Sequence, residues 1–198
     1  MKKFKAQKGA VLITIGLLLI LAAICLTGYN LIDEYRAGNE SETALAELTP
    51  FIPSEPVFSP DPNAEMPTIN IDGYDYIGTL KIPALELDLP VMAQWDYKRL
   101  RRAPCRYTGS VYRNDMVICA HNYPRHFGHI KNLSENDAVI FTDVDGNVFP
   151  YHVISIEILK PTDVELMETA NCGLTLFTCT IGGRTRVTVR CEADASQQ

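Results

Sequence analysis

Residues 174–190 read LTLFTCTIGGRTRVTVR, two short runs of apolar and β-branched residues joined by a pair of glycines. Such runs are typical of strands, and glycines between them are typical of a hairpin turn. The sequence therefore predicts a hairpin near the carboxyl end of the chain, with Cys179 at the end of its first strand. A rigid sheet holds a side chain at such a position while the adjoining loop leaves it accessible, so reactive groups are common there.

Similar runs precede this hairpin and predict a mainly β domain. They are bounded by Pro, Gly or Asp turn residues and cover residues 76–82, 85–89, 116–120, 138–142 and 148–159. Helical patterns are short and fall near residues 97–100, 129–133 and 163–169. Seven or eight short strands in about 125 residues favour a closed or nearly closed β-barrel.

The amino terminus has a different pattern. Residues 10–32 contain no charged side chain, and at about 1.5 Å per residue a helix of this length would cross the hydrocarbon core of a membrane. Four lysines lie in residues 1–9 and two acids follow the apolar run, so the positive-inside rule predicts a cytoplasmic amino terminus and an extracytoplasmic remainder. A cleaved signal peptide, or a lipoprotein signal at Cys25, is the alternative, but no clear cleavage site is present.

Residues 33–68 predict an acidic, Pro-rich spacer. They hold eight acidic residues against one basic residue, and six of the twelve prolines lie in residues 50–67. Proline favours extended conformations, whereas the Ala, Leu and Glu content of residues 33–48 is compatible with a brief helix. The predicted organisation has four segments: a cytoplasmic basic tail (1–9), a transmembrane anchor (10–32), this extracytoplasmic spacer (33–68) and a catalytic domain (69–198).

The charge distribution argues against one class of partner. The chain has 18 basic and 24 acidic residues and a formal net charge of −6. No segment beyond residue 9 has the basic excess that contact with a phosphate backbone requires. We therefore expect no nucleic-acid partner.

Six cysteines are present, one in the predicted span and five after it. All of them could be small buried apolar side chains, but a reactive thiol needs solvent access and a nearby base or cation. Cys179 meets these needs best, because Arg184, Arg186 and Arg190 follow in the return strand. A cation near the sulfur favours the thiolate and can donate hydrogen bonds to a developing oxyanion. Arg184 and Arg186 would point to the same strand face, since side chains repeat every second residue.

The base for this thiol would be one of four histidines. His121 directly follows the apolar run 116–120 and would also lie at a strand end, whereas His152 lies inside a strand-like run and is interpreted as structural. A Cys–His pair that is distant in sequence and adjacent in the fold is the arrangement expected for a thiol nucleophile. The sequence alone does not establish that adjacency.

These residues also carry a resemblance to a known family. TLFTC at residues 175–179 resembles the T-L-x-T-C signature of the sortases, the membrane-anchored cysteine transpeptidases of Gram-positive bacteria. Arg186 followed by VTV resembles the strand downstream of that signature, and Ala120-His121 resembles the segment around the sortase histidine. YIGTLKIP at residues 76–83 resembles the opening strands, so the similarity extends over roughly residues 74–192.

The resemblance implies a fold and an activity. The fold would be a closed eight-stranded sortase-type β-barrel with few short helices, preceded by an amino-terminal transmembrane helix. Cys179 would be the nucleophile, His121 the general acid and base, and Arg186 the residue that stabilises the oxyanion or orients the substrate. The enzyme would cleave an LPxTG-like cell-wall sorting signal through a thioester acyl-enzyme, and then transfer the acyl group to an amine. The resemblance implies no cofactor or metal, and it identifies no substrate-binding residues.

It also implies partners and a location. The substrates would be surface proteins or pilins with a carboxy-terminal sorting signal, and the acceptor an amine of a peptidoglycan precursor or a pilin lysine. The protein would cross the cell membrane once, with its catalytic domain on the cell-wall side. Features of class B and of class D sortases are both present, and Arg184 competes with Arg186 for the arginine role.

Two alternatives belong to other functional classes. Cys119, His121, His126 and His129 lie within eleven residues and could offer zinc ligands, although their spacing matches no strong zinc pattern. A non-catalytic, surface-anchored β-domain would also account for the anchor, the spacer and the strands.

Overall fold

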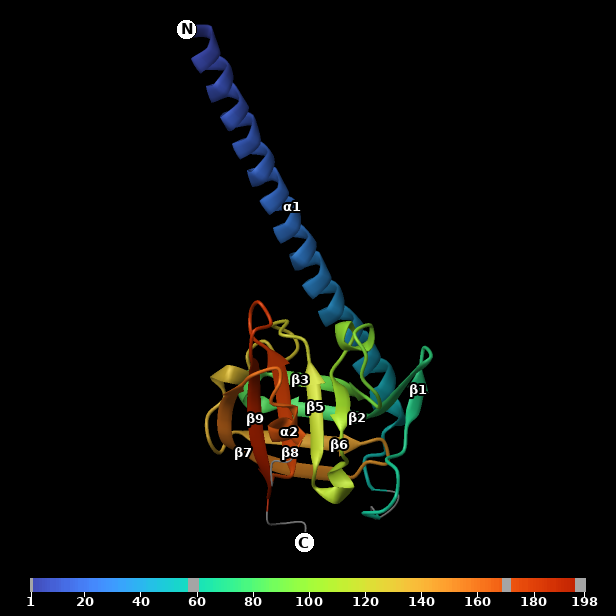
Figure 1. Cartoon of the computed structure of the whole chain (residues 1–198). Coiled ribbons are helices and arrows are strands. Elements are labelled where there is room, and N and C mark those ends of the chain that lie inside the picture. The colour runs from blue at the N-terminus through green and yellow to red at the C-terminus, as the bar shows by residue number, and fades with distance from the viewer. Residues whose placement is uncertain (1, 57–60, 169–171, 195–198) are drawn as a thin grey trace. The chain divides into compact units, whose positions relative to one another are not determined.

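The computed structural model describes residues 2–56, 61–168 and 172–194 (Figure 1). The chain divides into two compact units after Arg36. The first unit is the amino-terminal part of a long helix, α1 (Lys2–Leu48). The second unit contains the last turns of α1 and the whole of a β-barrel, and it carries every candidate site residue.

The barrel is closed by eight strands, and a ninth strand is added at its edge. The strand order is β1-β2-β3-β4-β5-β8-β9-β7-β6, and pairing of β2 with β6 closes the ring from β2 to β9. The prediction of a mainly β, closed eight-stranded barrel is therefore confirmed. The strands are β1 (Ile69–Ile71), β2 (Tyr74–Ile82), β3 (Leu87–Met92), β4 (Cys105–Thr108), β5 (Met116–Ala120), β6 (Ala138–Asp143), β7 (Val148–Leu159), β8 (Leu174–Cys179) and β9 (Arg186–Ala193).

The helices in the barrel unit are short, as predicted. Besides the end of α1, the described residues of this unit contain one α-helix, α2 (Val164–Glu168), in the connection from β7 to β8. The remaining helical segments are single 3₁₀ turns: η1 (Thr49–Phe51), η2 (Pro83–Leu85), η3 (Arg99–Arg101), η4 (Val111–Arg113) and η5 (Ile130–Asn132).

Two strands and several strand boundaries differ from the sequence-based prediction. β1 and β4 were not predicted, because three or four residues are too short to show alternation. β3 continues through Pro90, where the predicted run ended. Pro90 pairs with Thr79 of β2, while β4 pairs with β3 only at Met92. Pro90 is therefore locally at a sheet edge, where its missing N–H donor is tolerated.

Alternation along the strands separates two apolar clusters. Ile118, Leu176 and Val189 belong to the cluster that fills the barrel. Val117 and Phe177, which are sequence neighbours of these residues, belong to a second cluster outside the barrel wall. Every residue of β5 is buried, because both faces of this strand are covered. The ends of β5 and β8 are therefore held in place by apolar packing on both faces of the sheet.

The amino-terminal helix continues beyond the apolar run, in agreement with the helical composition of residues 33–48. It contains one stretch that is long and apolar enough to cross a membrane by length and composition. The helix then continues to Leu48, and Ala37, Ser41, Ala44 and Leu48 are buried at the spacing of one helical face. Arg125 pairs with Glu42 of this segment. Part of the region predicted as a spacer therefore packs on the barrel unit.

Gly78 lies where β2 and β6 close the barrel, in register with Asp143. Its φ is +152°, and a Cβ atom built on it would lie 2.0 Å from the carbonyl oxygen of Thr142. That oxygen belongs to the backbone of the paired strand, so it cannot move aside without disturbing the closure. Glycine is required here by the close approach of the two strands.

We expect Gly78→Ala to lower the free energy of unfolding by about 3 kcal/mol, because the added methyl group overlaps the β6 backbone. Urea unfolding of the full chain in detergent micelles, followed by the fluorescence of the single tryptophan, Trp95, measures this loss. Gly73→Ala is the matched control, since φ is +79° there but no atom lies within 4 Å of the added Cβ. The control should lose only about 1 kcal/mol, and equal losses in the two variants would contradict the steric explanation.

Candidate active site

Strand register brings three of the predicted residues into one row. β5 runs parallel to β8 with Ala120 opposite Thr178, so the next residues along the chain, His121 and Cys179, are neighbours. The Thr178 hydroxyl donates a 2.8 Å hydrogen bond to the Ala120 carbonyl and ties the two strand ends together. On the other side of β8, Cys179 pairs directly with Arg186 of β9. An imidazole, a thiol and a guanidinium thus lie at the ends of three adjacent strands, with His121 directly after β5.

The same three side chains line one pocket beside the barrel wall. One wall of the pocket is aromatic: the ring centroids of Trp95 and Tyr107 are 5.3 Å apart, and those of Tyr107 and Phe177 are also 5.3 Å apart. The other wall is aliphatic and comes from the connection between β7 and β8, with Pro161, Val164 and Met167. A largely apolar groove with a nucleophile and two polar groups at its edge suits an extended peptide with apolar side chains.

Cys179 differs from the other barrel cysteines in its environment. It is partly exposed, whereas the remaining four are buried, and all of them are free thiols: Cys105, Cys119, Cys172 and Cys191. Burial raises the pKa of Cys119 to about 12, and it raises the pKa of Cys105 and of Cys191 further. Cys119 also lines the pocket, but its burial keeps it protonated. Of these thiols, Cys179 has the solvent access that a nucleophile needs.

The two candidate arginines lie in different local structures. Arg186 is the first residue of β9, and its Nη1 atom donates to the carbonyls of Gly183 (3.1 Å) and Thr185 (3.2 Å). Arg184 is exposed in the turn that precedes β9. Arg184 lies outside β9, so the strand alternation from which a shared face was expected begins only at Arg186. Arg186 also lines the pocket with Cys179 and His121.

The loop after His121 is tightly folded. The amide of Phe127 donates to the carbonyl of His121 (3.1 Å), so the chain turns back directly after the strand end. The ring centroid of Tyr123 lies 5.0 Å from that of His121 and 5.6 Å from that of His126. Arg125 anchors the same loop to α1, with a 2.8 Å hydrogen bond to Asn39 besides its ion pair with Glu42. These contacts restrict the position of His121.

The remaining histidines have other environments. His126 is fully buried, and burial lowers its pKa to about 4, an effect that the nearby Ala37 backbone partly opposes. His126 is therefore neutral at physiological pH. His152 lies on β7 and its Nδ1 is 2.7 Å from Oδ1 of Asp194, which agrees with its interpretation as structural.

The zinc alternative is not supported by the structure. Within residues 2–56, 61–168 and 172–194, no three His, Cys, Asp or Glu side chains cluster closely enough to hold a metal ion. Cys119 and His121 face the pocket, whereas His126 is buried beside the end of α1. These residues are close in the sequence, but the fold does not bring them together as metal ligands.

The walls of the pocket were not predicted from the sequence. Phe177 had one available signal, since it precedes Cys179 by two residues and so shares its strand face. Trp95, Tyr107, Val164 and Met167 gave no such signal, because they come from segments outside the strand of Cys179.

Comparisons with known proteins agree on one family. A family model described as a Sortase domain matches residues 80–194, more than half of the chain. The chain is 24% identical over 180 residues to Sortase A of Bacillus anthracis, a match that covers 83% of this chain and 85% of that protein. It resembles the structure of Sortase C-3 from Streptococcus pneumoniae with a TM-score of 0.53 and 25% identity, covering 82% of this chain and 84% of that one. A Sortase D5 transpeptidase from Clostridium perfringens shares the fold, with a TM-score of 0.54, 18% identity, and coverage of 61% of this chain and 80% of that one.

We expect Cys179 to be alkylated first when the folded chain is treated with iodoacetamide at pH 8. With a pKa of about 12, Cys119 holds only about one part in 10,000 as thiolate at that pH. The measurement is peptide mass spectrometry at timed intervals in a Cys25→Ala background, which removes the exposed cysteine of α1. The added substitution Cys179→Ser should abolish the fast reaction. Labelling of Cys105 or Cys119 as fast as Cys179 would contradict the assignment of the reactive thiol.

Proposed function

The chain belongs to the sortase family, and on this premise we propose that it is a cysteine transpeptidase that cleaves LPxTG-like sorting signals at the cell membrane. The observation that carries the proposal is that His121, Cys179 and Arg186 lie at the ends of three adjacent strands and line one pocket. A thiol between a base and a cation, next to an apolar groove, meets the requirements of covalent acyl transfer.

In the proposed acylation step, the Cys179 thiolate attacks the carbonyl carbon of the scissile peptide bond. Arg186 donates hydrogen bonds to the oxygen that becomes negatively charged in the tetrahedral intermediate. His121, as imidazolium, gives its proton to the departing amine as the carbon–nitrogen bond breaks. The products are a thioester on Cys179, a released peptide with a free amino group and a neutral His121.

In the second step, an amine attacks the thioester carbonyl. His121 accepts the proton that this amine loses, the carbon–sulfur bond breaks, and Cys179 leaves as a thiolate. The new amide bond joins the sorted protein to the acceptor. Dividing the transfer into two steps allows the released peptide to leave before the acceptor enters. The acceptor would be the amine of a peptidoglycan precursor or the side chain of a pilin lysine.

The same proposal includes a membrane location. The apolar part of α1 would cross the membrane, with the basic residues 1–9 in the cytoplasm and the barrel on the cell-wall side. Substrates that still carry a carboxy-terminal sorting signal would be surface proteins or pilins at the membrane surface.

We expect three substitutions to reduce acyl transfer by different amounts. Cys179→Ala should abolish both the acyl-enzyme and the product, because no nucleophile remains. His121→Ala should slow turnover by about 10²- to 10⁴-fold, and Arg186→Ala by about 10²- to 10³-fold. The assay incubates the full chain in detergent micelles with LPxTG-type peptides and an amine, and mass spectrometry identifies the thioester and the cleaved bond.

Arg184→Ala is the matched control for Arg186→Ala, since it removes an equal charge from the exposed turn two residues away. It should retain turnover close to that of the unmodified chain. A larger loss in Arg184→Ala than in Arg186→Ala would reassign the arginine role. Acyl transfer that persists in Cys179→Ala would overturn the proposed mechanism and favour a non-catalytic surface domain.

We expect the full chain to stay in the membrane fraction after alkaline carbonate washing, with an amino-terminal tag protected from protease in intact protoplasts. A Leu18→Arg/Leu19→Arg variant should be released in part, because each charge near the centre of a span costs about 2.5–3.5 kcal/mol. Protease digestion of the tag in intact protoplasts would show that the proposed orientation is wrong.

A further inference from the structure

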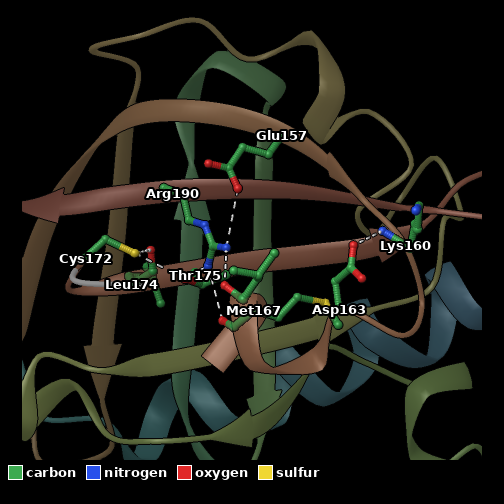
Figure 2. A network of polar contacts seen from close by, with 9 residues as sticks. Glu157, Lys160, Asp163, Met167, Cys172, Leu174, Thr175 and Arg190 are labelled. Atoms are coloured by element: carbon green, nitrogen blue, oxygen red, sulfur yellow. Dashed lines mark hydrogen bonds and ion pairs between the residues drawn. The ribbon is translucent and has the colours of Figure 1, made fainter. Parts of the chain in front are cut away.

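Arg190 is a buried cation on the outer face of the barrel wall. It lies on β9, four residues after Arg186 and on the same strand face, and only 5% of it is exposed. A guanidinium in such a place needs acceptors that replace water. Figure 2 shows them around Arg190, with Glu157 on one side of the guanidinium and Thr175 and Met167 on the other.

Two of these acceptors are backbone carbonyls at the end of α2. The Nη2 atom of Arg190 donates to the carbonyl of Leu166 at 2.6 Å, and Nη1 donates to the carbonyl of Met167 at 3.2 Å. Arg190 therefore ties two consecutive backbone carbonyls of α2 to strand β9.

The other contacts of Arg190 fix it to the sheet. Nη1 donates to the Thr175 hydroxyl of β8 at 3.0 Å, and Nη2 lies 3.5 Å from Oε2 of Glu157 on β7. The Thr175 hydroxyl is also 3.3 Å from the sulfur of the buried Cys172. A planar guanidinium can serve acceptors on both strands and on α2 at once, which a lysine ammonium cannot do in the same geometry.

The backbone that Arg190 holds carries one wall of the pocket. Val164 and Met167 of α2 line the pocket together with Cys179, and Met167 is only 3% exposed. At the start of α2, the Asp163 carboxylate accepts a 3.1 Å hydrogen bond from the backbone amide of Lys160 (Figure 2). The segment is thus fixed at its start by a local turn and at its end by Arg190.

We propose that Arg190 is a positioning residue for substrate: it holds α2 so that Val164 and Met167 form a fixed wall for the apolar part of the sorting peptide. Arg190 itself does not line the pocket, so it acts on peptide binding through α2 and takes no part in the acyl transfer at Cys179. This inference rests on the proposed function, since it takes the sorting peptide as the ligand of the pocket.

The test compares Arg190→Gln and Arg190→Lys with the unmodified full chain in detergent micelles. Arg190→Gln should raise the KM for the peptide by about tenfold while kcat stays within about twofold, because the thiol, the imidazole and Arg186 are untouched. Arg190→Lys should give a smaller rise in KM. The rate of Cys179 alkylation, which needs no peptide, should not change. A fall in kcat or in the alkylation rate with an unchanged KM would overturn the proposal.

Glu157→Gln is the matched control. It removes the charge on the side of Arg190 away from α2 and leaves both carbonyl contacts in place. Its KM should stay within about twofold of that of the unmodified chain. If Glu157→Gln raises KM as much as Arg190→Gln does, the ion pair and not the α2 contact is responsible, and the proposal fails.

A double-substitution cycle separates positioning from a general loss of stability. Met167→Ala removes part of the wall directly and should also raise KM. If Arg190 acts through this wall, the rise in KM of the combined variant should be smaller than the product of the rises in the two single variants. Independent, multiplicative effects would overturn the proposal.

Hydrogen exchange gives a measurement that does not depend on turnover. Amides of residues 163–168 should exchange faster in Arg190→Gln, while amides of β5 and β8 keep their protection. If the unmodified chain processes no sorting peptide, the proposed function fails, whereas the exchange result still stands for Arg190. Unchanged exchange in residues 163–168, or faster exchange throughout the barrel, would reject the positioning role.

Discussion

The parallel pairing of β5 with β8 is the constraint on which the candidate site depends. Neighbouring parallel strands require a long crossover, and here the chain between them forms β6, β7 and α2. That crossover closes the barrel, because β6 returns to pair with β2 and β7 pairs with β9. His121 and Cys179 are neighbours through the β5–β8 pairing, and the chain segment that makes this pairing possible also closes the barrel.

One pair of strands serves both the core and the site, because side chains alternate across a sheet. On β8, Leu174 and Leu176 fill the barrel, whereas Phe177 and Cys179 face the pocket. Such a strand cannot slip by one residue without moving the thiol into the core. The buried apolar residues therefore fix the position of the nucleophile as firmly as its immediate neighbours do.

The three arginines after Cys179 have different surroundings and, in our proposals, different roles. Arg184 is exposed in a turn, Arg186 is partly buried at the pocket, and Arg190 is buried against α2. Two of them use the same face of β9 at different distances from the thiol. In our proposals Arg186 acts on the reacting carbonyl, and Arg190 positions a wall of the pocket. Strand β9 therefore carries both a residue for acyl transfer and a residue for substrate binding.

The sequence by itself determined most strands, the mainly β class, the apolar span in α1 and the identity of the thiol, imidazole and arginine candidates. These features are local: strand alternation, turn residues and the TLFTC motif are all read over a few neighbouring positions. Only the tertiary structure decided which distant groups meet. It brought Trp95, Tyr107, Val164 and Met167 into one pocket, buried His126 beside Ala37 of α1, and directed Arg190 to the α2 carbonyls. Such contacts depend on register and barrel closure, which join segments that no local pattern relates.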